Sequence, residues 1–177
     1  MPINIDALTS RPQTDIYKLL GTMLQWNYPE LVSKTGIPVN ISSVKTPEYG
    51  GFFKKSIELP ESRLKEPINK DMLLSVLDSV LHEYKHGQDA ALGSPGKAIL
   101  QSMTYARRQQ LEDYLTSSNL PSTNTVRGAK QVDEALATKY SNDLLKRIVG
   151  MSYYGADQDR AALQDTIKLF PELGAKP

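Results

Sequence analysis

LLSVLDSVLHEYKH, residues 73–86, predicts a long helix with two different faces. Its apolar residues recur at helical spacing and form a broad stripe that must face a core. The stripe consists of Leu73, Val76, Leu77, Val80, Leu81 and Tyr84. His82 and His86 lie on the opposite side, because residues four apart share one face of a helix. Asn69 is placed to cap the start of this helix, and Gly87 is placed to end it.

Residues 82–86 read HEYKH, which is the pattern H-E-x-x-H. Two imidazoles one helical turn apart can hold a single metal ion between them. Glu83 lies on the neighbouring edge, where its carboxylate can take a proton from a metal-bound water. The chain has only these two histidines, so their placement in this pattern is informative. The alternative interpretation is a surface helix with two solvated histidines.

The third metal ligand must come from elsewhere in the chain, since a catalytic zinc takes three protein ligands plus water. There is no cysteine and no further histidine, so a carboxylate, or less expectedly a tyrosine, completes the site. Glu134 is the first candidate, because it lies on the apolar stripe of a helix expected over residues 130–149, where a buried acid needs a partner. Asp159, near the start of a last helix, is the alternative third ligand. Both acids also suit the first turn of a helix without any metal.

Three further side chains are candidates for supporting roles. Asp89 can accept a hydrogen bond from an imidazole N–H, or it can be an ordinary loop acid. Tyr153 and Tyr154 lie between two glycines, and either hydroxyl can donate a hydrogen bond to an oxyanion. A tyrosine in such a place can equally well serve packing alone.

The remaining pattern predicts a single α+β domain over residues 1–177. Two strands, residues 39–43 and 53–59, are expected to form a small antiparallel pair packed against several helices. Residues 116–128 are rich in Ser, Thr, Asn and Pro and predict a loop. Further helices are expected from Thr14 or Asp15 to about residue 26, over about residues 97–115, and from Asp157 or Asp159 to Phe170.

Composition disfavours several classes of protein. The formal net charge of +1 offers no field for nucleic acid or an anionic membrane, and the absence of cysteine removes disulfides and thiolate ligands. Residues 1–12 contain no apolar segment typical of a secretory signal, and no run of the sequence reaches membrane-spanning length. We therefore expect a soluble monomer that is cytoplasmic or exported by a signal-independent route.

The order of these motifs resembles that of the zincin metallopeptidases whose third ligand is glutamate. A strand precedes the helix with H-E-x-x-H, and a later helix carries E-x-x-A, here Glu134-Ala135-Leu136-Ala137. Toxin-type zincins place Tyr-Gly just before the helix that carries the third ligand. Tyr154-Gly155 followed by Asp159 is a looser match to that arrangement, with Asp in place of Glu.

This resemblance implies a compact zincin-like fold and a zinc-dependent endopeptidase similar to small bacterial effector or toxin proteases. His82, His86 and a carboxylate would bind Zn²⁺, and Glu83 would activate the zinc-bound water and then protonate the leaving amine. Tyr154 would assist catalysis, and the strand at residues 53–59 would seat a protein or peptide substrate. The alternative is a non-catalytic interaction protein that retains the zincin scaffold and its metal site.

Overall fold

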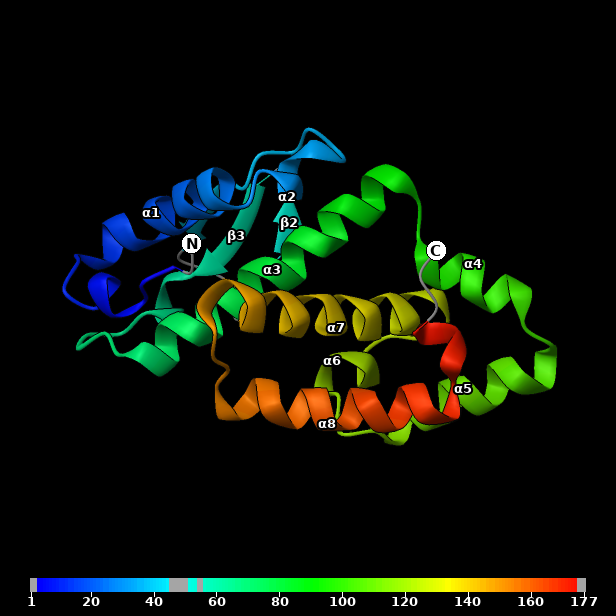
Figure 1. Ribbon diagram of the computed structural model, residues 1–177. Coiled ribbons are helices and arrows are strands. Elements are labelled where there is room, and N and C mark those ends of the chain that lie inside the picture. The colour runs from blue at the N-terminus through cyan, green and yellow to red at the C-terminus, as the bar shows by residue number, and fades with distance from the viewer. Residues whose placement is uncertain (1–2, 45–50, 54–55, 175–177) are drawn as a thin grey trace.

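The computed structural model describes residues 3–44, 51–53 and 56–174, and helices dominate it (Figure 1). None of the described helices combines the length and the apolar character that crossing a membrane requires. The helices are η1 (Asp6–Leu8), α1 (Gln13–Asn27), α2 (Glu30–Ser33), η2 (Glu61–Arg63), α3 (Lys70–Leu92), α4 (Pro95–Ser102), α5 (Tyr105–Ser117), α6 (Pro121–Asn124), α7 (Ala129–Val149), α8 (Tyr154–Leu169) and η3 (Pro171–Leu173). The strands are β1 (Ile41–Val44), β2 (Gly51–Phe53) and β3 (Ser56–Pro60).

The sheet differs from the expected antiparallel pair. Its strand order is β1-β3-β2, with β1 parallel to β3 and β2 antiparallel to β3. The sequence prediction treated residues 53–59 as one strand, whereas Phe53 belongs to β2 and residues 56–59 belong to β3, which is antiparallel to β2 and parallel to β1. Residues 54 and 55, inside the predicted strand, lie outside the described part. The predicted zincin-like fold with an antiparallel sheet is therefore wrong, although a small sheet among many helices is compatible with a broad α+β class.

Helix α3 begins as predicted and ends later than predicted. The Asn69 side chain accepts a hydrogen bond from the Met72 N–H at 2.9 Å, which caps the helix. The six residues of the apolar stripe are each at most 1% exposed. The prediction that Gly87 ends the helix is wrong, because α3 continues to Leu92 and stops before Gly93, whose φ is 104°. Tertiary contact outweighs the helix-breaking tendency of glycine here, since the buried Gln88 side chain donates to the Leu31 carbonyl at 3.0 Å.

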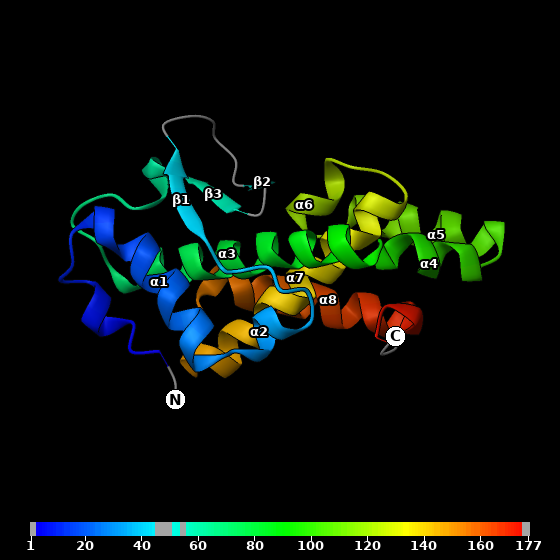
Figure 2. The ribbon, with the colours of Figure 1, turned by 90° about the horizontal axis from the view of Figure 1, so that it is seen from above.

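Two hydrophobic clusters hold the helices together, and α7 contributes to both. The first lies among α1, the sheet and α3, and it includes Leu145 and Ile148 of α7. The second lies among α4, α5, α7 and α8, and it includes Val132 and Ala135 of α7. Full burial of one such aliphatic side chain stabilises a fold by about 1.5–3 kcal/mol. Figures 1 and 2 show α7 lying between α3 and α8, so the α7 side chains between the two clusters are held against α3.

The region after α3 folds back over the side of that helix that carries His82 and His86. The single helix expected over residues 97–115 is two helices in the structure, because the helical conformation is interrupted at Met103. Thr104 then caps α5 by accepting a hydrogen bond from the Arg107 N–H at 3.4 Å. The expected loop at 116–128 contains α6, whose Thr123 is fully buried and donates to the Leu115 carbonyl at 2.8 Å. This anchoring places α6 beside α7, where it forms one wall of the site described below.

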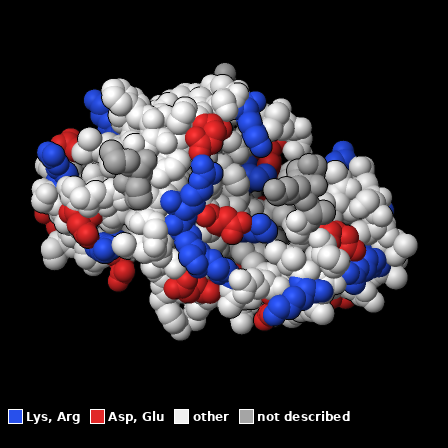
Figure 3. Space-filling view, in the orientation of Figure 1, with Lys and Arg blue, Asp and Glu red and all other residues white. Residues whose placement is uncertain are grey.

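Charged side chains of both signs lie next to one another on the face shown in Figure 3. Ion pairs across the described surface include Arg147 with Glu30 at 2.8 Å and Lys139 with Asp143 at 2.7 Å. Exposed pairs of this kind contribute about 0–1 kcal/mol each. They therefore add little to the stability that the two hydrophobic clusters supply.

Candidate metal centre

Three side chains from two helices converge on one point. His82 and His86 come from α3, and Glu134 comes from α7. The Nε2 atom of His82 lies 3.0 Å from Glu134 Oε2, and the Nε2 atom of His86 lies 3.2 Å from Glu134 Oε1. The two Nε2 atoms are 3.1 Å apart. The prediction that Glu134 joins the two histidines therefore agrees with its position, and these three form a group that could hold a metal ion.

The spacing of these atoms fits a metal ion bound between them. Tetrahedral bonds of about 2.0–2.1 Å to nitrogen or oxygen put neighbouring ligand atoms about 3.3 Å apart. The observed separations of 3.0, 3.1 and 3.2 Å are close to that edge length. Two imidazole nitrogens and a carboxylate oxygen also form a donor set that divalent transition metals accept. The three ligand atoms thus lie close enough together to contact one ion.

Electrostatics keeps the Glu134 carboxylate charged. Burial raises the pKa of Glu134, but hydrogen bonds from His82 and His86 outweigh burial and lower it to about 2. Burial lowers the pKa of His86, and the contact with Glu134 outweighs it, so that the pKa is raised overall. Without a metal, a proton on His86 can therefore balance the carboxylate. A bound cation would replace that proton.

The far side of the His82 ring faces a residue that the sequence did not single out. Thr138 Oγ1, on α7, lies 3.5 Å from His82 Nδ1. If Nε2 binds a metal, Nδ1 carries the hydrogen and donates it to this hydroxyl. Asp89, predicted as a possible partner of an imidazole, instead pairs with Lys85 one turn earlier on α3. Thr138 could have been anticipated from its position, since it follows Glu134 by four residues on the same helix face.

Glu83 lies beside the three converging residues and is partly shielded from solvent. Its side chain is half-buried on α3 and lines the same cavity as His82 and Glu134. Burial raises the pKa of Glu83, and the positive charge that His82 and His86 can carry opposes that rise without cancelling it. A raised pKa makes a carboxylate a stronger base, which favours the acceptance of a proton. Glu83 therefore has the position and the electrostatics of a general base.

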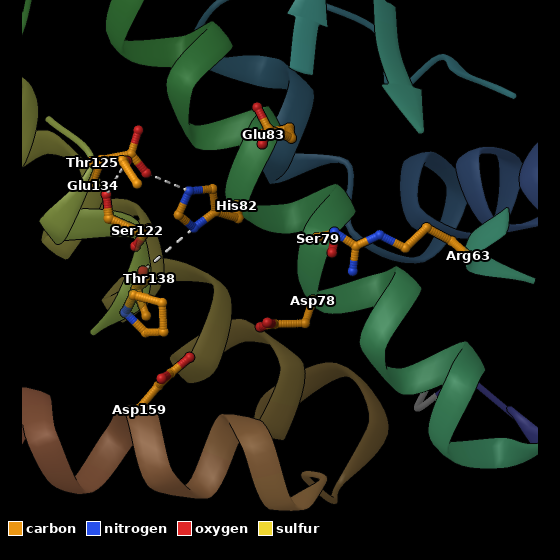
Figure 4. Close-up of a pocket in the computed structure, with 11 residues that line it drawn as sticks. Arg63, Asp78, Ser79, His82, Glu83, Ser122, Thr125, Glu134, Thr138 and Asp159 are labelled. Atoms are coloured by element: carbon orange, nitrogen blue, oxygen red, sulfur yellow. Dashed lines mark hydrogen bonds and ion pairs between the residues drawn. The ribbon is translucent and has the colours of Figure 1, made fainter. Parts of the chain in front are cut away.

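The site opens into a cavity of about 540 Å³ (Figure 4). Its walls come from η2, α3, α6, α7 and α8, and Thr125 adds to the α6 side. The sequence reasoning missed several of its lining residues, namely Arg63, Asp78, Ser122, Thr125 and Thr138. Asp78 was detectable, because it precedes His82 by four residues and so shares its helix face. Arg63 and the α6 residues reach the cavity only through the tertiary fold.

Asp159, the alternative third ligand, lines this cavity without joining the converging group. The described cluster of ligand atoms consists of His82, His86 and Glu134. Burial raises the pKa of Asp159 to about 6, and the nearby charge of Asp78 adds to the rise. Its carboxyl group points from α8 toward the cavity in Figure 4. Asp159 is thus a wall residue of the cavity, beyond the reach of the two imidazoles.

The two tyrosines lie in different environments. Tyr154 begins α8 with its side chain 78% exposed, and its hydroxyl accepts a hydrogen bond from the Gln158 side chain at 2.8 Å. It is not among the described residues that line the cavity, so its position does not support the expected catalytic role. Tyr153 is half-buried and donates to Asp78 Oδ2 at 3.2 Å. Tyr153 therefore contributes by holding a cavity side chain in place.

The strand that was predicted to seat the substrate, residues 53–59, also differs from the expectation. Within the described part of the sheet, β3 is paired on both sides, so its backbone has no free edge for a peptide. Strand β2 is at the edge that contacts α3, and β1 is at the other edge. Any added peptide strand would have to pair with one of these two short strands.

Comparisons with known proteins assign no family to this chain. No protein-family model matches it, and neither does any curated protein or solved structure. The function has to be inferred from the geometry of the site itself.

Proposed function

We propose that the protein is a zinc-dependent endopeptidase that hydrolyses a protein or peptide substrate. One observation carries the proposal, namely that His82, His86 and Glu134 converge within bonding reach of a single ion beside Glu83. The adjoining cavity of about 540 Å³ is large enough for a short stretch of peptide. A zinc ion in this position would supply Lewis acidity and would make a water molecule more acidic.

Zinc is the metal that the donor set favours. The chain has no cysteine, and two imidazoles with one carboxylate are a ligand set of catalytic zinc sites, in which three protein ligands leave one position open. Magnesium and calcium prefer sites built from oxygen atoms alone. The Thr138 hydroxyl would hold the His82 ring in the orientation that presents Nε2 to the ion.

Glu83 is the residue to which we assign the proton transfers. Its carboxylate accepts a proton from the water that attacks the peptide carbonyl, and it returns a proton to the amine nitrogen as the C–N bond breaks. Its position supports this role, because Glu83 lines the same cavity as His82 and Glu134. The exposed Tyr154 has no part in this scheme.

The test compares wild-type protein with Glu83→Gln after zinc loading and removal of excess metal. We expect about one zinc per chain in both proteins and about 10²–10⁴-fold slower hydrolysis of an unfolded fluorescent protein substrate by the variant. Glu112→Gln, on α5 and outside the cavity lining, is the matched control and should keep full activity. Equal hydrolysis by wild type and Glu83→Gln, or no zinc bound after loading, would contradict the proposal. Zinc binding by wild-type protein without any hydrolysis would favour the non-catalytic alternative.

A further inference from the structure

Arg63 lies in the wall of the cavity opposite the candidate metal ligands. It is the last residue of η2, which directly follows β3. Figure 4 shows its side chain entering from the side opposite His82 and Glu134, with the guanidinium directed into the cavity. A cationic group therefore lies within the same space as the proposed site of hydrolysis.

The guanidinium of Arg63 has no hydrogen bond or ion pair with another side chain within the part of the chain that the structure describes. Three other arginines pair with carboxylates, as Arg107 does with Glu172, Arg147 with Glu30 and Arg160 with Asp157. The five N–H groups of a guanidinium seek acceptors, and a carboxylate meets them best through two parallel hydrogen bonds. Arg63 thus offers an unused binding group to whatever enters the cavity.

Charge is distributed unevenly along the cavity. Glu83 experiences the charge of Arg63, whereas Asp159 experiences that of Asp78 and His82. In Figure 4 the Arg63 guanidinium enters on one side of His82 and Glu83, and the Asp159 carboxyl lies on α8 on the other side. A carboxylate on a bound molecule is attracted to the guanidinium and repelled by a charged Asp159.

We propose that Arg63 determines substrate specificity by binding a carboxylate of the peptide on the Glu83 side of the metal site. This inference rests on the proposed peptidase function. The carboxylate belongs either to an aspartate or glutamate side chain close to the cleaved bond, as an endopeptidase requires, or to the C-terminus of the substrate, which would make the enzyme a carboxypeptidase. Both present the same planar pair of oxygens to the guanidinium, so the experiment must separate them.

The experiment measures peptide binding in the zinc-loaded Glu83→Gln protein, in which bound peptide stays intact. The probes are fluorescent octapeptides of neutral sequence, blocked at both ends, with one Asp moved through the sequence and an Asn peptide matched to each. A second pair carries a free C-terminal carboxylate or its amide. We expect about ten-fold tighter binding, measured by fluorescence anisotropy, for one Asp position or for the free acid over its neutral match.

Variants of Arg63 in the same background identify the residue responsible. Arg63→Gln should abolish the ten-fold preference, and Arg63→Lys should keep part of it, because an ammonium retains the charge but cannot bind in the bidentate manner. Arg11→Gln removes an exposed arginine outside the cavity lining and should keep the whole preference. Circular dichroism of each variant checks that the fold is retained.

The possible results separate this inference from the proposed function. Equal binding of every charged peptide and its neutral match, no binding of any peptide, or a preference that survives Arg63→Gln would overturn the role of Arg63. Cleavage by wild-type protein without a carboxylate preference would overturn the role of Arg63 and leave the peptidase function standing. A preference lost in Arg63→Gln, with no cleavage by wild-type protein, would support the carboxylate site and contradict the peptidase function.

Discussion

Thr138 Oγ1 lies 3.5 Å from Nδ1 of His82, while Glu134, one turn earlier on α7, faces Nε2 of the same ring. One helix thus fixes both nitrogens of a histidine carried by another helix. We predict that Thr138→Val, which removes the hydroxyl at nearly constant volume, weakens zinc binding about 10-fold or more because the ring loses its orienting partner. Thr138→Ser should stay close to wild type. Competition with a chromophoric chelator measures the affinity, and an unchanged affinity in Thr138→Val would show that the hydroxyl does not orient the ring.

The identity of the third ligand gives a second prediction. Glu134→Ala removes the carboxylate that touches both imidazoles, and we expect its zinc affinity to fall at least about 100-fold. Asp159→Ala should bind zinc within a few-fold of wild type, because Asp159 lies outside the ligand group. Metal content after gel filtration at low free zinc distinguishes the two variants. Retention of zinc by Glu134→Ala together with its loss from Asp159→Ala would reverse the assignment made here.

Features that depend on residue spacing within a single helix were predictable from the sequence. The apolar stripe of α3 and its Asn69 cap depend on residue spacing within one helix, and both are present in the structure. Glu134 was identified because an acid on an apolar stripe requires a partner, and the structure brings it to the two histidines. Periodicity and burial therefore identified the candidate metal centre without any homologous protein.

Features that depend on chain direction or on distant contacts were not predictable. Phe53 and Ile57 fit the alternation of one strand, yet they belong to β2 and β3, which run in opposite directions, and β1 pairs with β3 in parallel rather than antiparallel. Gly87 resembles a helix end until the buried Gln88 beyond it is taken into account. Arg63 enters the cavity because η2 follows β3 across the face of α3, and nothing in its local sequence indicates that position.

Gly21 gives a prediction about the fold itself. It lies inside α1, where alanine would ordinarily stabilise the helix by about 1 kcal/mol. A Cβ atom at this position would lie 2.5 Å from the carbonyl oxygen of Val39, so the helix could no longer approach the chain before β1 as closely. We expect Gly21→Ala to lower the free energy of unfolding by about 1–3 kcal/mol in urea denaturation. Thr22→Ala, at the exposed neighbouring position, should change it by less than about 0.5 kcal/mol.

Asp159 makes the stability of the metal-free protein depend on pH. Its pKa rises from 3.8 to about 6 on folding, first through burial and then through the charge of Asp78. The folded state therefore binds more protons than the unfolded state between these values, so the free energy of unfolding decreases as the pH rises through that range and is level above it. Asp159→Asn should remove this dependence and stabilise the protein near neutral pH by about 1 kcal/mol, a value reduced because the side chain is only half-buried.

Urea denaturation of metal-free protein at about pH 4 and about pH 7 tests this expectation. Metal must be absent, because a cation bound by the nearby His82 would lower the pKa of Asp159 and weaken the effect. Asp165→Asn is the control on the same helix, since Asp165 forms an exposed pair with Lys168 at 2.8 Å. Relative to wild type, Asp159→Asn should gain stability at the higher pH and gain little at the lower. An equal gain at both pH values would mean that the cavity does not perturb the Asp159 carboxyl, and that its replacement acts through packing instead.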